Sequence, residues 1–155
     1  METLTPISDY EIERKKPMPS KNHARVEHRL NVLLAQFEEF DVLSELSLDL
    51  PTGDTVPDLC LYPKMDFDWE NDQTRMITPP ITTFEILSPT QAVQDLVQKI
   101  RNSYFPAGVQ SSWLIIPPLK TVHVFYPDQS PQTYTNGLIK DQATGIEINI
   151  ADIFK

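Results

Sequence analysis

One short apolar segment, Ile81 to Leu87, constrains the fold more than any other part of the sequence. Two prolines precede it and Ser88-Pro89 follows it, so its length and boundaries are typical of a buried strand rather than a helix. Side chains alternate along a strand, which places Glu85 on one face with Thr83 and Leu87. An unpaired carboxylate in a core strand is costly, so Glu85 is expected to be protonated, paired or bound to a cation.

A second acid lies in the segment from Val56 to Tyr62, which is also short, apolar and typical of a strand. If the two segments are neighbours in one sheet, Asp58 and Glu85 converge. Two carboxylates, together with a backbone carbonyl and water, are oxygen ligands that suit Mg²⁺ or Mn²⁺. A metal site is therefore one interpretation of this pair of acids.

A helix is expected after the Glu85 strand, opened by Ser88-Pro89-Thr90 and followed by apolar residues at helical spacing. Asp95 and Lys99 lie four positions apart and are neighbours on its surface. On these residues alone, the simpler interpretation is an exposed ion pair worth about a few tenths of a kcal/mol. The functional alternative brings Lys99 to the two acids.

Together these segments resemble the Uma-two family of restriction-endonuclease-like proteins, which belongs to the PD-(D/E)xK nuclease superfamily. The resemblance covers the chain from about residue 10 to residue 126 and rests on Glu13 to His23, Glu45 to Leu48, Pro57-Asp58, Glu85 to Pro89, Asp95-x3-Lys99-x4-Tyr104, Gly108-Val109 and Trp113. There are departures from the pattern. Leu87 stands where the superfamily has a lysine, and Ser112 and Pro117 stand where the family has acids.

The resemblance implies an α/β fold with a restriction-endonuclease-like core, in which helices flank a central mixed β-sheet. It implies a metal-dependent endonuclease, a hydrolase that cleaves DNA phosphodiester bonds, with Asp58, Glu85 and Lys99 as catalytic residues. Asp58, Glu85 and the main-chain carbonyl of Ile86 would hold Mg²⁺ or Mn²⁺. Glu45 is then a candidate outer acid, and Asp95 is a candidate helix partner of Lys99.

The alternative is a catalytically silent module that keeps the nuclease fold for binding or assembly. The departures from the family pattern favour it, and so does the net charge of −9. Lys and Arg supply most nonspecific affinity for nucleic acid, so this charge argues against a nonspecific binder. It does not exclude a nuclease, because a bound metal ion neutralises a phosphate locally.

One basic run lies near the N-terminus, where Lys15, Lys16, Lys21 and His23 are candidate phosphate contacts. The alternative for this run is a solvated arm and helix face. His23 is expected at the surface, at a phosphate rather than at a metal. A homodimer is also expected, since twofold assemblies are the commonest and match the symmetry of duplex DNA.

The length of 155 residues predicts one domain over residues 1–155, with an N-terminal arm at residues 1–19. Helices are expected near 21–40, with Ser20 as N-cap, and near 90–105. Strands are expected near 42–50, 55–62, 81–87, 112–116 and 121–126, with weaker candidates at 133–135 and 146–150. No segment has the form of a signal peptide or membrane span, so a cytoplasmic protein without membrane contact is expected.

Overall fold

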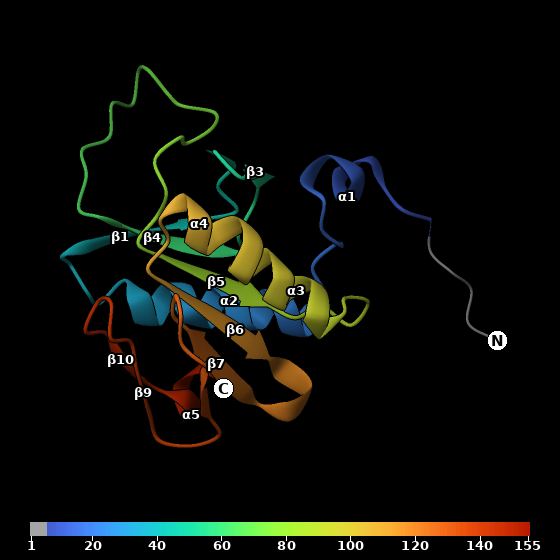
Figure 1. Ribbon diagram of the computed structural model, residues 1–155, viewed down its shortest axis with the longest axis vertical. Helices are drawn as coiled ribbons and strands as arrows, with labels where there is room; N and C mark the ends of the chain where they lie inside the picture. The colour runs from blue at the N-terminus through green and yellow to red at the C-terminus, as the bar shows by residue number, and fades with distance from the viewer. Residues whose placement is uncertain (1–5) are drawn as a thin grey trace.

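The computed structural model describes residues 6–155, so the first five residues of the predicted arm lie outside the described part. Its centre is a six-stranded mixed sheet with helices on its two faces (Figure 1), which confirms the predicted α/β class. In spatial order the strands are β1 (Phe40–Ser44), β4 (Leu59–Pro63), β5 (Thr82–Ile86), β6 (Ser111–Ile116), β7 (Thr121–Phe125) and β8 (Gln132–Tyr134). The β5–β6 pair is parallel and the other neighbours are antiparallel.

The parallel pair is joined by a helical crossover, as parallel neighbours require. This crossover runs through α3 (Val93–Lys99), a π-helical segment η1 (Ile100–Tyr104) and α4 (Phe105–Ala107). Gly108 ends it with a φ of 111°, a left-handed conformation that favours glycine. The helix begins at Val93 rather than Thr90, because the preceding residues form a turn in which the Ser88 N–H donates to the side chain of Gln91.

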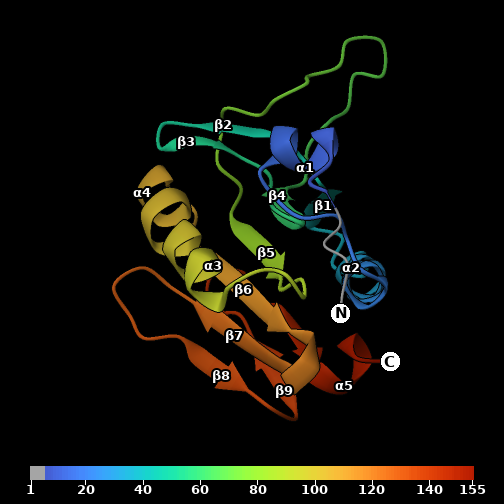
Figure 2. The ribbon, with the colours of Figure 1, turned by 90° about the vertical axis from the view of Figure 1, so that its right-hand side faces the viewer.

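Two apolar clusters lie on the two faces of the sheet. Figure 2 shows the helices that cover these faces on opposite sides of the strands. On one face, α2 (Lys21–Leu34) packs residues such as Leu30 against Phe84 and Trp113. On the other face, the crossover packs residues such as Ile100 against Leu114. The predicted N-cap is confirmed, since the Ser20 hydroxyl accepts a hydrogen bond from the His23 N–H. The helix ends at Leu34 instead of residue 40, where β1 already begins.

The predicted strand at 42–50 is divided between two sheets. Its first part is β1, which pairs with β4, whereas β2 (Leu48–Leu50) forms a separate hairpin with β3 (Gly53–Thr55). The break falls at Glu45, which has a φ of 53° and turns the chain out of the central sheet. The Glu45 N–H still donates to the carbonyl of Asp58, so the break keeps these two acids adjacent.

The remaining elements lie at the ends of the chain. In the arm, α1 (Asp9–Arg14) is a short helix without buried residues, and the sequence patterns did not predict it. The second weak strand candidate contains β10 (Glu147–Asn149), which pairs with β9 (Leu138–Lys140) and leads into α5 (Ile150–Ile153). Within residues 6–155, no helix is long and apolar enough to cross a membrane.

Candidate active site

Asp58 and Glu85 meet because of the register between β4 and β5. Leu59 pairs with Phe84 in this antiparallel ladder, so continuing the register by one residue sets Asp58 opposite Glu85. Residues opposite each other share a face of the sheet. Both acids are buried, with 1% of Asp58 and 2% of Glu85 exposed. The two predicted acids therefore lie together in the interior, at the end of adjacent strands.

Both carboxylate oxygens of Asp58 have partners. The ammonium of Lys16 lies 2.5 Å from Oδ1, while Oδ2 lies 3.1 Å from Nε2 of His23 and accepts a hydrogen bond from the Ile86 N–H at 2.7 Å. Burial alone would raise the pKa of Asp58, but the hydrogen bond from His23 and the charge of Lys16 outweigh it and lower the pKa to about 2. Asp58 is therefore ionised and held by the ammonium of Lys16 and the imidazole of His23.

Lys16 and His23, the two side chains that hold Asp58, come from the segments preceding the sheet. Lys16 lies in the arm just after α1, and His23 lies in the first turn of α2. Only 7% of the Lys16 side chain and 3% of His23 are exposed. The expected surface position is therefore wrong for both residues. The basic pattern resembles a solvated run, but the acids of the sheet provide the opposite charge that makes burial of these groups tolerable.

Glu85 is held by the crossover helix. The ammonium of Lys99 lies 2.8 Å from Oε1 of Glu85, and the hydroxyl of Tyr104 donates a hydrogen bond to the same oxygen. In the described part of the chain, Lys99 thus pairs with Glu85 rather than with Asp95, which is exposed on the same helix. The interpretation of an exposed Asp95–Lys99 pair is wrong, because the strand places a buried acid within reach of this lysine.

Tyr104 is a site residue that the sequence analysis named only as part of the family motif, without a role at the site. It is fully buried, and burial together with the negative charge of Glu85 raises its pKa well above the usual value. In a regular α-helix, positions five apart point about 140° away from each other. The π-helical segment, in which the Phe105 N–H bonds to the carbonyl of Ile100, brings Lys99 and Tyr104 to one carboxylate. Their five-residue spacing was the available indication.

Glu27 is the second site residue, after Tyr104, that sequence reasoning missed. Glu27, Glu45 and Asp58 each offer a carboxylate oxygen within 4.8 Å of the others. Burial raises the pKa of Glu27 to about 7, with the charges of Glu45 and Asp58 adding to the effect. Glu27 follows His23 by four positions on α2, so the two share a helix face, and this spacing was the only indication of its place. These carboxylate donors fit the oxygen preference of Mg²⁺ and Mn²⁺.

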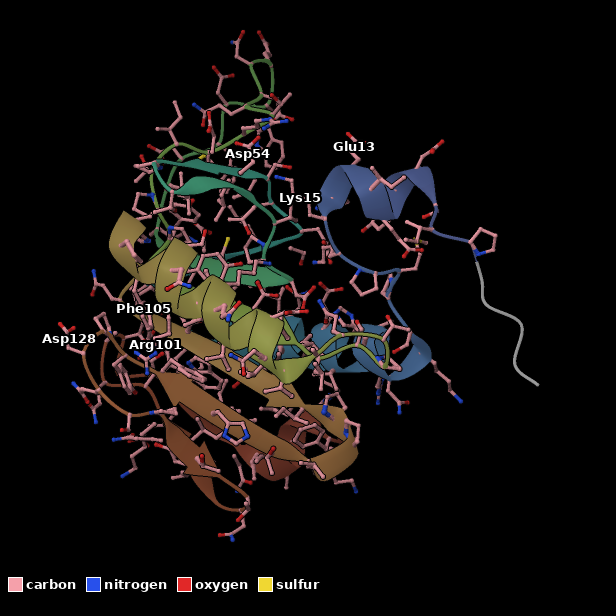
Figure 3. The ribbon with its side chains drawn as sticks, turned by 45° about the vertical axis from the view of Figure 1, so that its right-hand side comes forward. Glu13, Lys15, Asp54, Arg101, Phe105 and Asp128 are labelled. Carbon is pink, nitrogen blue, oxygen red and sulfur yellow. The ribbon has the colours of Figure 1, made fainter. Side chains whose placement is uncertain are left out.

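A cleft of about 650 Å³ lies next to the two lysines that pair with Asp58 and Glu85. The arm forms one wall and the crossover helix the other, and both Lys16 and Lys99 line it. Lys15 and Asp54 also line it and lie on the arm side and the hairpin side of the gap (Figure 3). Lys21, the remaining candidate phosphate contact, lies outside this cleft beside a smaller cavity of about 430 Å³.

Comparisons with known proteins agree with this fold. The sequence profile of the Uma2 family, described as "Putative restriction endonuclease", matches residues 6–151. The crystal structure of "a putative nuclease" from Anabaena variabilis has a TM-score of 0.74 at 24% identity, covering 89% of this chain and 83% of that one, which shows a common fold. A cryo-EM structure of the DrdV–DNA complex has a TM-score of 0.43 at 10% identity, covering 84% of this chain and 12% of that one, and supports no inference. No curated protein matches the sequence.

Proposed function

The chain belongs to the Uma2 family, described as "Putative restriction endonuclease", and from this premise we propose that it is a metal-dependent endonuclease that hydrolyses DNA phosphodiester bonds. One observation carries the proposal. Glu85 lies opposite Asp58 in the sheet register and has the ammonium of Lys99 2.8 Å away, and Lys99 lines a cleft. Two acids can hold a divalent ion, and a lysine can offset the charge that develops on a phosphate during hydrolysis.

The proposed metal ligands are Asp58, Glu85 and the main-chain carbonyl of Ile86, with Glu45 as an outer acid. Mg²⁺ or Mn²⁺ bound there would polarise the scissile phosphate and lower the pKa of the attacking water. The protein fixes both carboxylates in advance, because the Ile86 N–H orients Asp58 and the Tyr104 hydroxyl orients Glu85. Such preorganised oxygens avoid a rearrangement during the reaction.

Lys99 is the proposed replacement for the superfamily lysine, whose position Leu87 occupies. The side chain of Leu87 is half-buried in the apolar cluster beneath the crossover helix, so that position is filled by packing. The Lys99 ammonium reaches the site from the helix instead, and 23% of its side chain is exposed towards the cleft. There it can position the attacking water and offset the negative charge that develops on the phosphate.

DNA is proposed to reach the acids through the cleft, where Lys15 is a candidate phosphate contact and Asp95 lies on the wall beside Lys99. A homodimer is part of this proposal, since two copies related by a twofold axis would match the symmetry of a duplex.

A catalytically silent binding module is the second candidate. The observation that favours it is that Lys16 and Lys99 already neutralise Asp58 and Glu85 from within the protein. The departures at Leu87, Ser112 and Pro117 point the same way.

Nicking of supercoiled plasmid DNA in Mg²⁺ or Mn²⁺ tests the two candidates. We expect the wild type to nick the plasmid and Glu85→Ala to be inactive, while Glu70→Ala, a change at an exposed loop acid, retains activity. Nicking that persists in Glu85→Ala would show that another protein or another site is responsible. Intact plasmid with the wild type in both metals, on circular and linear DNA, supports the silent module.

A further inference from the structure

Lys16 occupies the position of a cation within the carboxylate site. Its ammonium lies 2.5 Å from Oδ1 of Asp58, 2.9 Å from Oε2 of Glu45 and 3.5 Å from the carbonyl oxygen of Val56. An ammonium has three N–H donors, so these three oxygens engage it completely. Burial alone would lower the pKa of Lys16, but Asp58, Glu85 and Glu45 raise it above the usual value, so the group is charged.

Two of the acids that hold Lys16 belong to the proposed cation site, Asp58 as a ligand and Glu45 as an outer acid. Asp58 and Glu45, with Glu27, form the group of carboxylates whose oxygens lie within 4.8 Å of one another. Mg²⁺ requires oxygen ligands at about 2.0–2.1 Å in a closely defined geometry. An ammonium on the same carboxylate oxygen occupies part of that space and repels the ion through little intervening water.

We propose that Lys16 and a divalent cation compete for Asp58 and Glu45, so that the cation binds only when Lys16 withdraws together with the arm, residues 6–19. The inference rests on the proposed function for the presence of a metal at these acids. Lys16 is then the residue that sets the cation affinity of the site. Lys16 also makes the site favour divalent ions. A monovalent ion carries the same charge as the ammonium that it replaces, so its electrostatic attraction to the carboxylates is little stronger.

The arm is suited to withdraw because little else holds it. Its helix α1 has no buried residue, and Lys15, at the end of α1, is in the left-handed conformation that turns the chain towards the site. Besides Lys16, the arm is tied to this site by Arg14, whose guanidinium lies 3.2 Å from the Glu45 carboxylate and 2.6 Å from its carbonyl oxygen. A divalent ion at Glu45 weakens that contact as well.

Lys99 provides the contrast. It lies on the crossover helix, whose residues Leu96, Ile100 and Tyr104 are buried on the sheet, so its backbone cannot leave the site. Its ammonium contacts Glu85 and the carbonyl oxygen of Val56 rather than the carboxylates of Asp58 and Glu45. The competition therefore concerns Lys16 and leaves Lys99 in place.

The first test is a calorimetric titration with Mn²⁺ in the absence of DNA. Lys16→Met keeps the length of the side chain and removes its charge, and it should lower the Kd at least about tenfold. The control, Lys64→Met, removes a charge that is exposed and remote from the arm, and its Kd should stay within about twofold of the wild type. Equal Kd values for Lys16→Met and the wild type overturn the inference, and so does the absence of Mn²⁺ binding in both.

The second test follows the arm of the wild-type protein, so it holds even if a variant folds poorly. Trypsin can cut after Arg14 and Lys15, whereas the Lys16-Pro17 bond resists it. Mn²⁺ should speed these cuts at least about fivefold, since exposure of a segment controls its proteolysis. An unchanged rate at saturating Mn²⁺ overturns the inference. Tighter Mn²⁺ binding by Lys16→Met, together with the absence of plasmid nicking by the wild type, would support the inference and reject only the endonuclease proposal.

Discussion

The two acids at the centre of the site are buried to the same degree but are held by different parts of the chain. Glu85 is held by Lys99 and Tyr104, which lie on the helix directly following its strand. Asp58 is held by Lys16 and His23, and Lys16 is separated from it by 42 positions. One half of the site thus depends on a local strand–helix connection, and the other half depends on the docking of the arm and α2.

Loss of Lys99 should have the largest effect on activity. A general acid–base or charge-stabilising group contributes about 10²–10⁴-fold, so Lys99→Ala should lower metal-dependent plasmid nicking about a thousandfold. The fold should persist, because the side chain is only half-buried and alanine is favourable in a helix. Circular dichroism is the control for folding.

The same experiment can be extended to a rescue. Leu87 shares a strand face with Glu85, so Leu87→Lys in the Lys99→Ala background should restore part of the activity. Undiminished nicking by Lys99→Ala would remove the proposed role of this lysine and leave Glu85 with the role of a metal ligand alone.

Loss of Asp58 should have the largest effect on stability. Asp58→Asn leaves the buried ammonium of Lys16 without its counterion and weakens the contact with His23, which should cost about 3 kcal/mol in urea denaturation. Glu85→Gln should cost less, about 1 kcal/mol, because Lys99 is more exposed and can be hydrated. Equal losses would mean that the two halves of the site are energetically alike.

Loss of the Tyr104 hydroxyl should have an intermediate effect. Tyr104→Phe retains the buried ring and removes the hydrogen bond to Glu85, so it should cost about 2 kcal/mol, as is typical of bonds to charged groups. Tyr62→Phe is the matched control, since the Tyr62 hydroxyl bonds to a neutral carbonyl and should cost about 1 kcal/mol. A Tyr104→Phe loss no larger than that of the control would mean that Glu85 is not held by this bond.

The smallest effect concerns the pH dependence of stability through Glu27. The pKa of Glu27 rises from 4.5 to about 7 on folding, so the folded state binds this proton more tightly than the unfolded state. The resulting penalty is absent below pH 4.5, grows as pH rises and is complete above about pH 7. Because Glu27 is only partly buried, Glu27→Gln should stabilise the protein by about 1 kcal/mol near pH 8 and by little at acid pH. Glu38→Gln, at an exposed position, should show no such pH-dependent gain.

The contrast between the two halves also explains what the sequence could predict. The strands around Asp58 and Glu85 and the helical crossover follow from apolar periodicity and proline boundaries, which act locally. The placement of Lys99 at the site follows from the family resemblance, because Lys99 lies on the helix after the strand that contains Glu85. Neither pattern contains the docking of the arm, so the basic run around Lys16 and His23 resembled a solvated surface. Glu27 resembled an ordinary acid on a charged helix for the same reason.

The division of residues 42–50 between two sheets has a related cause. Alternation of leucine with polar residues continues past Glu45, so the periodicity alone indicated one strand. The left-handed conformation of Glu45 interrupts it, and such a conformation is uncommon for a non-glycine residue. Its cost is accepted where the Glu45 N–H bonds to the Asp58 carbonyl and its carboxylate meets Lys16, contacts that exist only in the folded protein.

The π-helical segment makes the Glu85 half tolerant of changes in chain length. Deletion of one residue between Lys99 and Tyr104 would let an ordinary α-helical turn form, with the lysine and tyrosine four positions apart and still on one face. Deletion of two would leave them three apart, which also makes them neighbours. The lysine and tyrosine can therefore reach one carboxylate across three lengths of the connecting helix. A deletion at this point would alter the pitch of the helix and preserve the pair of donors.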